Sequence, residues 1–122
     1  MWIYSQSSGH LRDPHDRLLC AAGYSGSGFD KNQPADEGIV NLGPIPQGDW
    51  RIGEAQDDAR LGPVVMALTP MKGTDALGRS GFYIHGDNAE HLGQSSHGCV
   101  ILPRSIRALM AVSEDRTLRV EL

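Results

Sequence analysis

The sequence predicts a small, mainly β protein, an antiparallel β-sandwich or barrel, with one helix near its C-terminal end. Short apolar, strand-prone stretches recur along the chain, and glycine, proline, aspartate and asparagine separate them. One late stretch has the periodicity of an amphipathic helix instead. The length of 122 residues, with 15 glycines and 7 prolines, fits one turn-rich domain over residues 1–122.

The strands are predicted from their apolar residues and from the turn residues at their ends. Trp2–Tyr4 is the first expected strand, and a turn at Ser7–Gly9 follows it. Tyr24–Gly38 is rich in glycine, asparagine and aspartate and is expected to be a long loop. Asn41–Gly48, with two prolines, is expected to be a rigid turn. The other expected strands are Arg17–Gly23, Asp49–Ile52, Pro63–Thr69, Gly81–His85, Cys99–Leu102 and Thr117–Leu122.

The helix is expected to begin at Pro103, because proline suits the first position of a helix. Its start directly after Cys99–Leu102 would brace that strand against the helix. The spacing of the residues after Pro103 places four of them on the side of the helix that faces the core, and places the charged residues on its other sides. The inward set is Ile106, Leu109, Met110 and Ser113, and the others are Arg104, Arg107 and Glu114.

Charge and hydropathy exclude several kinds of partner. The net charge of −4 provides no basic surface for nucleic acid or for an anionic membrane. The longest apolar runs, such as Val64–Leu68, are far shorter than the ~20 residues that span a bilayer. Met1–Cys20 carries charges where a signal peptide needs apolar residues. We therefore expect synthesis in the cytoplasm, with no membrane insertion.

The two cysteines differ in their surroundings. Cys20 lies among leucines and alanines and is expected to be a buried core thiol. Cys99 closes the motif Ser96–Cys99, and His85 lies upstream in Tyr83–Asp87. A thiolate is a nucleophile that a nearby imidazole can generate, and the glycine before the cysteine permits a tight turn that aims backbone N–H groups at an oxyanion. This pattern predicts a cysteine acyl-transfer enzyme.

Two other classes compete with this interpretation. A zinc site could be assembled from one cysteine and three histidines, but the close ligand pairs typical of structural zinc are absent from the sequence, so no metal or cofactor is expected. A module that binds the cell wall or a partner without turnover is the other alternative. The residues of the zinc alternative are His85, His91, His97 and Cys99.

Three segments of the chain resemble one enzyme family. Ile84–Gly86, followed by Ser96–Val100, resembles the signature of YkuD-like L,D-transpeptidases, and Gly43–Ile52 is similar to a proline- and glycine-rich segment of that family. The fuller layout resembles the compact L,D-transpeptidase effectors that bacteria inject into competitors by type VI secretion. That layout adds Trp2, Tyr4, Gly23–Gly26, Asn32 and Asp87.

The chain departs from the family pattern at two places. The spacer between the two motifs, residues 86–95, is shorter than usual, which implies a trimmed lid over the site. Ile101 stands two positions after the cysteine, where the family usually has asparagine or arginine. Neither departure removes the nucleophile.

The resemblance implies a role for each motif residue. Cys99 would attack a carbonyl in the peptide stem of peptidoglycan, and His85 would be the base, paired with the thiolate as an ion pair. The backbone carbonyl of Gly86 would orient the imidazole. The N–H groups of Gly98 and Cys99 would stabilise the oxyanion, and His97 would orient the loop or line the oxyanion site.

Four further residues are assigned supporting parts. Ser96 is expected to form local hydrogen bonds, and Asp87 to cap a turn or touch substrate. Tyr24 and Arg79 are candidates for contacting the stem, whose carboxylates an arginine could bind, or else are structural.

The implied reaction cleaves the bond between a diamino acid and D-alanine in tetrapeptide stems, or exchanges the terminal D-amino acid. Formation of 3–3 crosslinks is the alternative. The effector resemblance also implies delivery to the periplasm of a rival bacterium through a secretion apparatus, and a cognate immunity protein as a partner.

Overall fold

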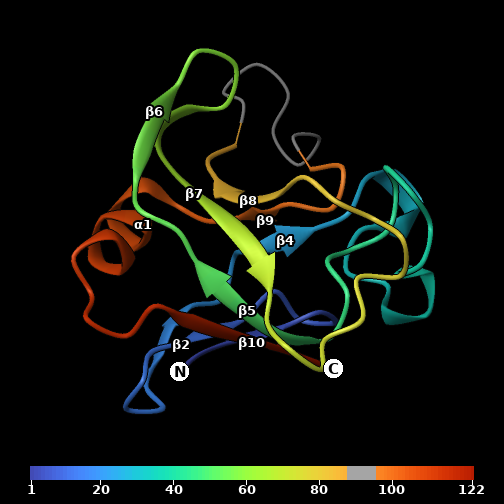
Figure 1. The fold of residues 1–122 in the computed structure, drawn as a ribbon, viewed down its shortest axis with the longest axis horizontal. Coiled ribbons are helices and arrows are strands. Elements are labelled where there is room, and N and C mark those ends of the chain that lie inside the picture. Colours follow the sequence, from blue (N-terminus) through green and yellow to red (C-terminus); the bar gives the residue numbers. More distant parts are fainter. Residues whose placement is uncertain (88–95) are drawn as a thin grey trace.

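The computed structural model describes residues 1–87 and 96–122, which form one mixed ten-stranded sheet and, within these ranges, one α-helix (Figure 1). The strand order is β3-β2-β1-β10-β5-β7-β8-β9-β4, with β6 paired to β7. The strands are β1 (Trp2–Ser5), β2 (Leu11–Arg12), β3 (Leu18–Cys20), β4 (Tyr24–Ser25), β5 (Gly48–Ile52), β6 (Gln56–Asp58), β7 (Gly62–Pro70), β8 (Phe82–His85), β9 (Val100–Ile101) and β10 (Thr117–Glu121); the helix is α1 (Arg104–Ala111).

The predicted fold class is confirmed: the protein is mainly β, and its helix follows Cys99. Most neighbouring strands are antiparallel, but β1 pairs with β10 and β8 with β9 in parallel. The chain ends therefore lie on neighbouring strands in the middle of the sheet. The β8–β9 pair matters most here, because it carries the two motifs of the sequence.

Alternating burial explains why the longer strands form where they do. Trp2 and Tyr4 of β1 point into the core, and so do Leu118 and Val120 of β10, with Trp2 paired to Leu118. Trp50 of β5 is completely buried. Its ring meets Phe82 of β8 edge-on at 5.0 Å between centroids, an arrangement that aromatic pairs favour. The core thus extends from the terminal strands to β8.

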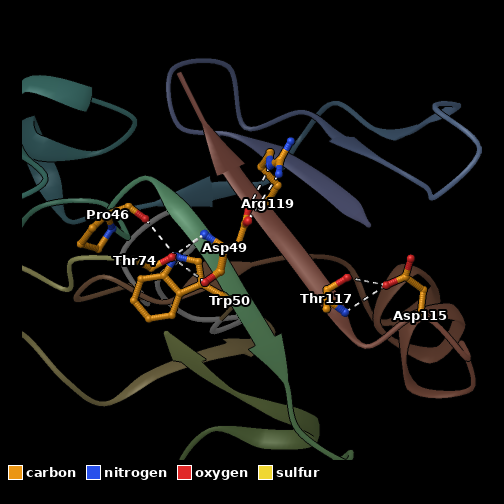
Figure 2. Close-up of polar contacts among 7 residues, drawn as sticks. All are labelled: Pro46, Asp49, Trp50, Thr74, Asp115, Thr117 and Arg119. Atoms are coloured by element: carbon orange, nitrogen blue, oxygen red, sulfur yellow. Dashed lines mark hydrogen bonds and ion pairs between the residues drawn. The ribbon is translucent and has the colours of Figure 1, made fainter. Parts of the chain in front are cut away.

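Polar contacts fasten the strand β5 and the turn before it (Figure 2). The indole Nε1 of Trp50 donates to the Pro46 carbonyl at 3.1 Å, which satisfies the buried N–H. The Asp49 backbone N–H donates to Thr74 Oγ1 at 2.8 Å, and that hydroxyl donates back to the Asp49 carbonyl. The Asp49 carboxylate also pairs with Arg119 of β10 at 2.9 Å. The turn that leads into β5 is therefore held on both sides.

Several details differ from the sequence predictions. The expected strand Arg17–Gly23 is reduced to β3, where Leu18 is exposed and Cys20 is buried, as predicted for that thiol. The expected loop Tyr24–Gly38 contains β4 and two 3₁₀ turns, Gly28–Asp30 and Pro34–Asp36. The short strands β2 and β6 were not predicted.

The helix lies where the sequence predicts, but the set of residues that it buries differs in part from the prediction. Pro103 is the residue before the first turn, and Met110 is buried as expected. Leu109 is 52% exposed, whereas Arg107 is buried. The reason is that the Arg107 guanidinium finds backbone carbonyl acceptors beneath the helix, and a buried charge needs such partners. Among the described residues, no helix is both long and apolar enough to cross a bilayer.

Candidate active site

His85 and Cys99 are brought together by the parallel pair β8–β9. Ile84 pairs with Val100 and His85 pairs with Ile101, so Cys99 falls beside Tyr83. Because side chains alternate along a strand, Ile84 and Val100 enter the core, and both are fully buried. His85 and Cys99 belong to the opposite face. The two motifs, which lie apart in the sequence, thus share one face of neighbouring strands.

The orientation of His85 is set by its own neighbour. The imidazole is only 3% exposed, and its Nδ1 lies 2.9 Å from the carbonyl oxygen of Gly86, the contact that the sequence predicts. A carbonyl can only accept a hydrogen bond, so Nδ1 carries the proton. Nε2 of the neutral ring then has the free lone pair. The backbone of His85 is fixed as well, because its carbonyl accepts from the N–H of Leu102 at 3.1 Å.

The surroundings of His85 favour its neutral form. Burial lowers the pKa of the imidazole. The Gly86 hydrogen bond opposes this shift, and the nearby charge of Arg107 reinforces it. The net direction is downward, so His85 is unprotonated at neutral pH and can accept a proton.

The Cys99 thiol is neutral too. Burial raises its pKa to about 11, although the backbone N–H of Tyr83 and the charge of Arg79 act in the opposite direction. Its Sγ lies 3.8 Å from the carbonyl oxygen of Gly81, toward which the S–H points. The predicted ion pair between Cys99 and His85 is therefore wrong for this structure. Desolvation outweighs the charges that would stabilise a thiolate.

This difference predicts a pH profile for alkylation of Cys99 by iodoacetamide. A pKa near 11 means that the thiolate fraction, and with it the rate, rises about tenfold per pH unit across the neutral and mildly alkaline range. The modification is followed by mass spectrometry of the Cys99 peptide at several pH values. A rate that is already constant near pH 7 would instead indicate a preformed thiolate–imidazolium pair.

Ser96 ties the loop before Cys99 together with the local bonds that the sequence predicts. Its hydroxyl donates to the Cys99 carbonyl at 2.6 Å and accepts from the N–H groups of Gly26 at 2.9 Å and Gly98 at 3.1 Å. Ser25 also donates to the Gly98 carbonyl at 3.1 Å. Gly98 therefore does not offer its N–H to an oxyanion here, contrary to the prediction, because Ser96 already takes it.

His97 belongs to the same loop but points away from the core. Its side chain is exposed, and Nδ1 lies 3.1 Å from the carbonyl oxygen of Asn41. This contact links the cysteine motif to the segment that leads into the Gly43–Gly48 turn. Of the two parts expected for His97, the geometry favours orientation of the loop.

Arg79 links the loop that contains His97 to the Gly43–Gly48 turn through hydrogen bonds from its guanidinium. It is 7% exposed and donates to the carbonyls of Pro44 at 2.7 Å and Gly43 at 2.9 Å, with a longer contact to the His97 carbonyl at 3.4 Å. The guanidinium also lies over the Phe82 ring at 5.1 Å. The suggestion that Arg79 contacts substrate is not supported, because backbone acceptors occupy its N–H groups. It is a positioning residue, which agrees with the structural alternative that the sequence left open.

Tyr24 of β4 and Asp87, which follows His85 by two residues, form a pair. The Tyr24 hydroxyl donates to the Asp87 carboxylate at 2.7 Å. Both side chains line an open cavity of about 480 Å³ that extends to the start of α1. Asp87 thus has a structural partner, and both residues stay candidates for contacting a ligand.

Two residues at this cavity were not singled out from the sequence as site residues. Arg104 and Arg107, both from α1, line it as well. Their spacing of three residues was visible, but nothing local indicated that the helix would lie against Gly86. Within residues 1–87 and 96–122, no group of three or more His, Cys, Asp or Glu side chains is arranged to hold a metal ion. His91 of the zinc alternative lies outside the described residues.

Comparison with known proteins identifies the family. No curated protein matches the chain. A sequence model of the Tlde1 domain matches residues 20–121, a range that includes both motifs and the helix. That domain defines the type VI secretion L,D-transpeptidase effectors, whose activity is directed at peptidoglycan. Because the match covers most of the chain, this protein belongs to the Tlde1 family.

Proposed function

We propose that the protein is a cysteine acyltransferase that acts on peptidoglycan tetrapeptide stems and removes or exchanges the terminal D-alanine. One observation carries this proposal: His85, with Nδ1 bound to the Gly86 carbonyl, shares a strand-pair face with Cys99. The imidazole is thereby held in the tautomer that can accept a thiol proton at Nε2. Membership of the Tlde1 family supports peptidoglycan as the substrate.

The first half of the reaction forms a thioester. Cys99 turns its S–H from the Gly81 carbonyl toward His85, and Nε2 takes the proton as Sγ attacks the carbonyl carbon of the diamino acid. Because both groups start neutral, proton transfer accompanies the attack. The Cys99 N–H is the predicted donor left for the oxyanion, since Gly98 donates to Ser96. Collapse breaks the C–N bond, and the D-alanine amine leaves with the proton from His85.

The second half resolves the thioester. Water, deprotonated by His85, attacks the acyl carbon, releases the Cys99 thiol and leaves a tripeptide stem. A free D-amino acid in place of water gives exchange, and the amine of a second stem gives a 3–3 crosslink. All three outcomes use the same acyl-enzyme.

The family also supports a cellular role. We propose that residues 1–122 act as one catalytic domain, delivered by type VI secretion into the periplasm of a target bacterium. The producing cell would then need an immunity protein that blocks the same site.

A direct assay tests the proposal. Purified disaccharide-tetrapeptide is incubated with the wild-type protein or with Cys99→Ala, with and without a free D-amino acid, and the products are analysed by mass spectrometry. We expect loss of D-alanine with the wild type only, and a mass shift for the swapped residue when the free amino acid is present. Wild-type protein that is folded and reduced but leaves the substrate unchanged would favour the non-catalytic binding module.

A further inference from the structure

The cavity beside the proposed catalytic pair has a chemistry that the acyl-transfer steps do not use. Its volume is about 480 Å³, and it is open to solvent. Its lining comes from β4, from the segment after β8, from β9 and from the start of α1. The residues that matter here are Tyr24, Asp87, Ile101, Arg104 and Arg107.

The cavity lies next to the catalytic face of the sheet. Ile101 pairs with His85 on one side and with Tyr24 on the other, so these three residues form a row across β8, β9 and β4. Cys99 precedes Ile101 by two residues on the same face, which corresponds to roughly 7 Å along a strand. A ligand bound at Cys99 that extends by about one residue past His85 would reach the cavity.

Two guanidinium groups give the cavity its charge. Arg107 is anchored from its inner side: Nε donates to the Leu102 carbonyl at 3.0 Å and Nη1 to the Val64 carbonyl at 3.1 Å. Its outer nitrogen, Nη2, lies against Gly86, where a Cβ would come within 2.6 Å. Arg104, one helical turn earlier, is exposed.

Neither arginine has an acidic partner among the described residues. No ion pair to Arg104 or Arg107 is formed within the part of the chain that the structure describes. Burial and the nearby charge of Arg104 both lower the pKa of Arg107, as expected of two cations held close together without an anion. Asp87, which is the acidic residue among the described lining residues, accepts a hydrogen bond from the Tyr24 hydroxyl. The described lining of this open cavity therefore carries two positive groups and one negative group.

We propose that this cavity is a carboxylate-binding subsite for the stem peptide. Arg104 contacts the carboxylate, and Arg107, which backbone carbonyls hold in place, forms a rigid part of the lining. The inference rests on the proposed function for the identity of the peptide. Arginine suits the part because its planar fork matches a carboxylate, and an anion between the two guanidinium groups relieves their repulsion. The subsite would select stems that carry a free carboxylate near the diamino acid.

Equilibrium binding tests the subsite without depending on turnover. The Cys99→Ala protein is titrated by calorimetry with a synthetic tetrapeptide stem. Adding Arg104→Met should weaken binding by roughly tenfold, whereas Arg104→Lys should recover part of the loss. Arg51→Met is the matched control, because Arg51 is an exposed arginine on β5, three strands away from β9 in the sheet order. Its Kd should equal that of the parent.

Amidated stems identify the carboxylate. The peptide is prepared with the carboxylate of position two, of the diamino acid or of the terminal alanine converted to an amide. One of the three amidated peptides should bind the Cys99→Ala protein about tenfold more weakly than the unmodified peptide does. Adding Arg104→Met should cause no further loss of affinity for that amidated peptide. Equal Kd values with and without Arg104, or for all four peptides, would overturn the subsite, as would the absence of measurable binding.

The two proposals fail in different ways. If wild-type protein never releases D-alanine but binding still depends on Arg104 and on one carboxylate, the catalytic proposal is wrong and the subsite stands. If D-alanine is released but KM and Kd are the same for Arg104→Met, the subsite is wrong and the catalytic proposal stands.

Discussion

His85→Gln is expected to lower kcat for D-alanine release by a factor of about 100 to 10,000, with little change in KM. The expectation follows from the resting state of the pair. The thiol pKa is raised to about 11 and the imidazole pKa is lowered, so attack needs a base at the moment of reaction. Glutamine retains polarity in this buried position, where His85 is 3% exposed, but cannot accept a proton at neutral pH.

His97→Gln is the matched control for that experiment. Both histidines belong to the motif, yet His97 is exposed and its Nδ1 lies near the Asn41 carbonyl. Its loss should loosen one loop contact and change kcat much less than His85→Gln does. The reverse order of effects would assign the base to His97 and contradict the geometry of the site.

Gly98→Ala is expected to destabilise the protein by about 3 kcal/mol or more and to abolish turnover with it. Gly98 has a φ of +124°, which side chains rarely adopt. A Cβ there would also overlap the Arg79 guanidinium and come within 3.1 Å of the Phe82 ring. Arg79 cannot move aside easily, because backbone carbonyls hold it. Either Cys99 or the loop beneath it must shift.

Gly78→Ala separates backbone strain from crowding. Gly78 also has a positive φ, +74°, but nothing lies within 4 Å of a Cβ built on it. The substitution should cost only about 1–2 kcal/mol, the ordinary strain of a left-handed residue, and should retain activity. Urea denaturation of both variants measures the difference. Equal losses would show that close packing of Gly98 on Arg79 is not what makes this position intolerant.

Much of the fold could be predicted from local pattern. In strands such as β1 and β10, buried residues alternate with partly buried or exposed ones, and Trp2, Tyr4 and Leu118 show that period clearly. The two-residue strands Leu11–Arg12 and Tyr24–Ser25 could not be found this way, because two residues carry no period. Leu11–Arg12 pairs with β1 and β3, and Tyr24–Ser25 pairs with β9, so both strands depend on partners elsewhere in the chain.

Part of the site could also be predicted, because its key residues lie in two short motifs. The bond from His85 to the Gly86 carbonyl joins adjacent residues and was expected. The state of the thiol was not, because the desolvation of Cys99, a half-buried residue, depends on which parts of the fold pack around it. The contacts of Arg79 and Arg107 could not be predicted either, because their hydrogen-bond acceptors lie far away in the sequence, at Pro44 and Val64.

The central claim is that Cys99 carries the acyl group, and intact-mass spectrometry of rapidly quenched reactions tests it most directly. Wild-type protein mixed with tetrapeptide stem and quenched in acid should gain the mass of the tripeptide acyl group, and peptide mapping should place it on Cys99. D-Alanine should be released in step with that adduct. Release of D-alanine by Cys99→Ala, or an adduct on Cys20 or any other residue, would contradict the account.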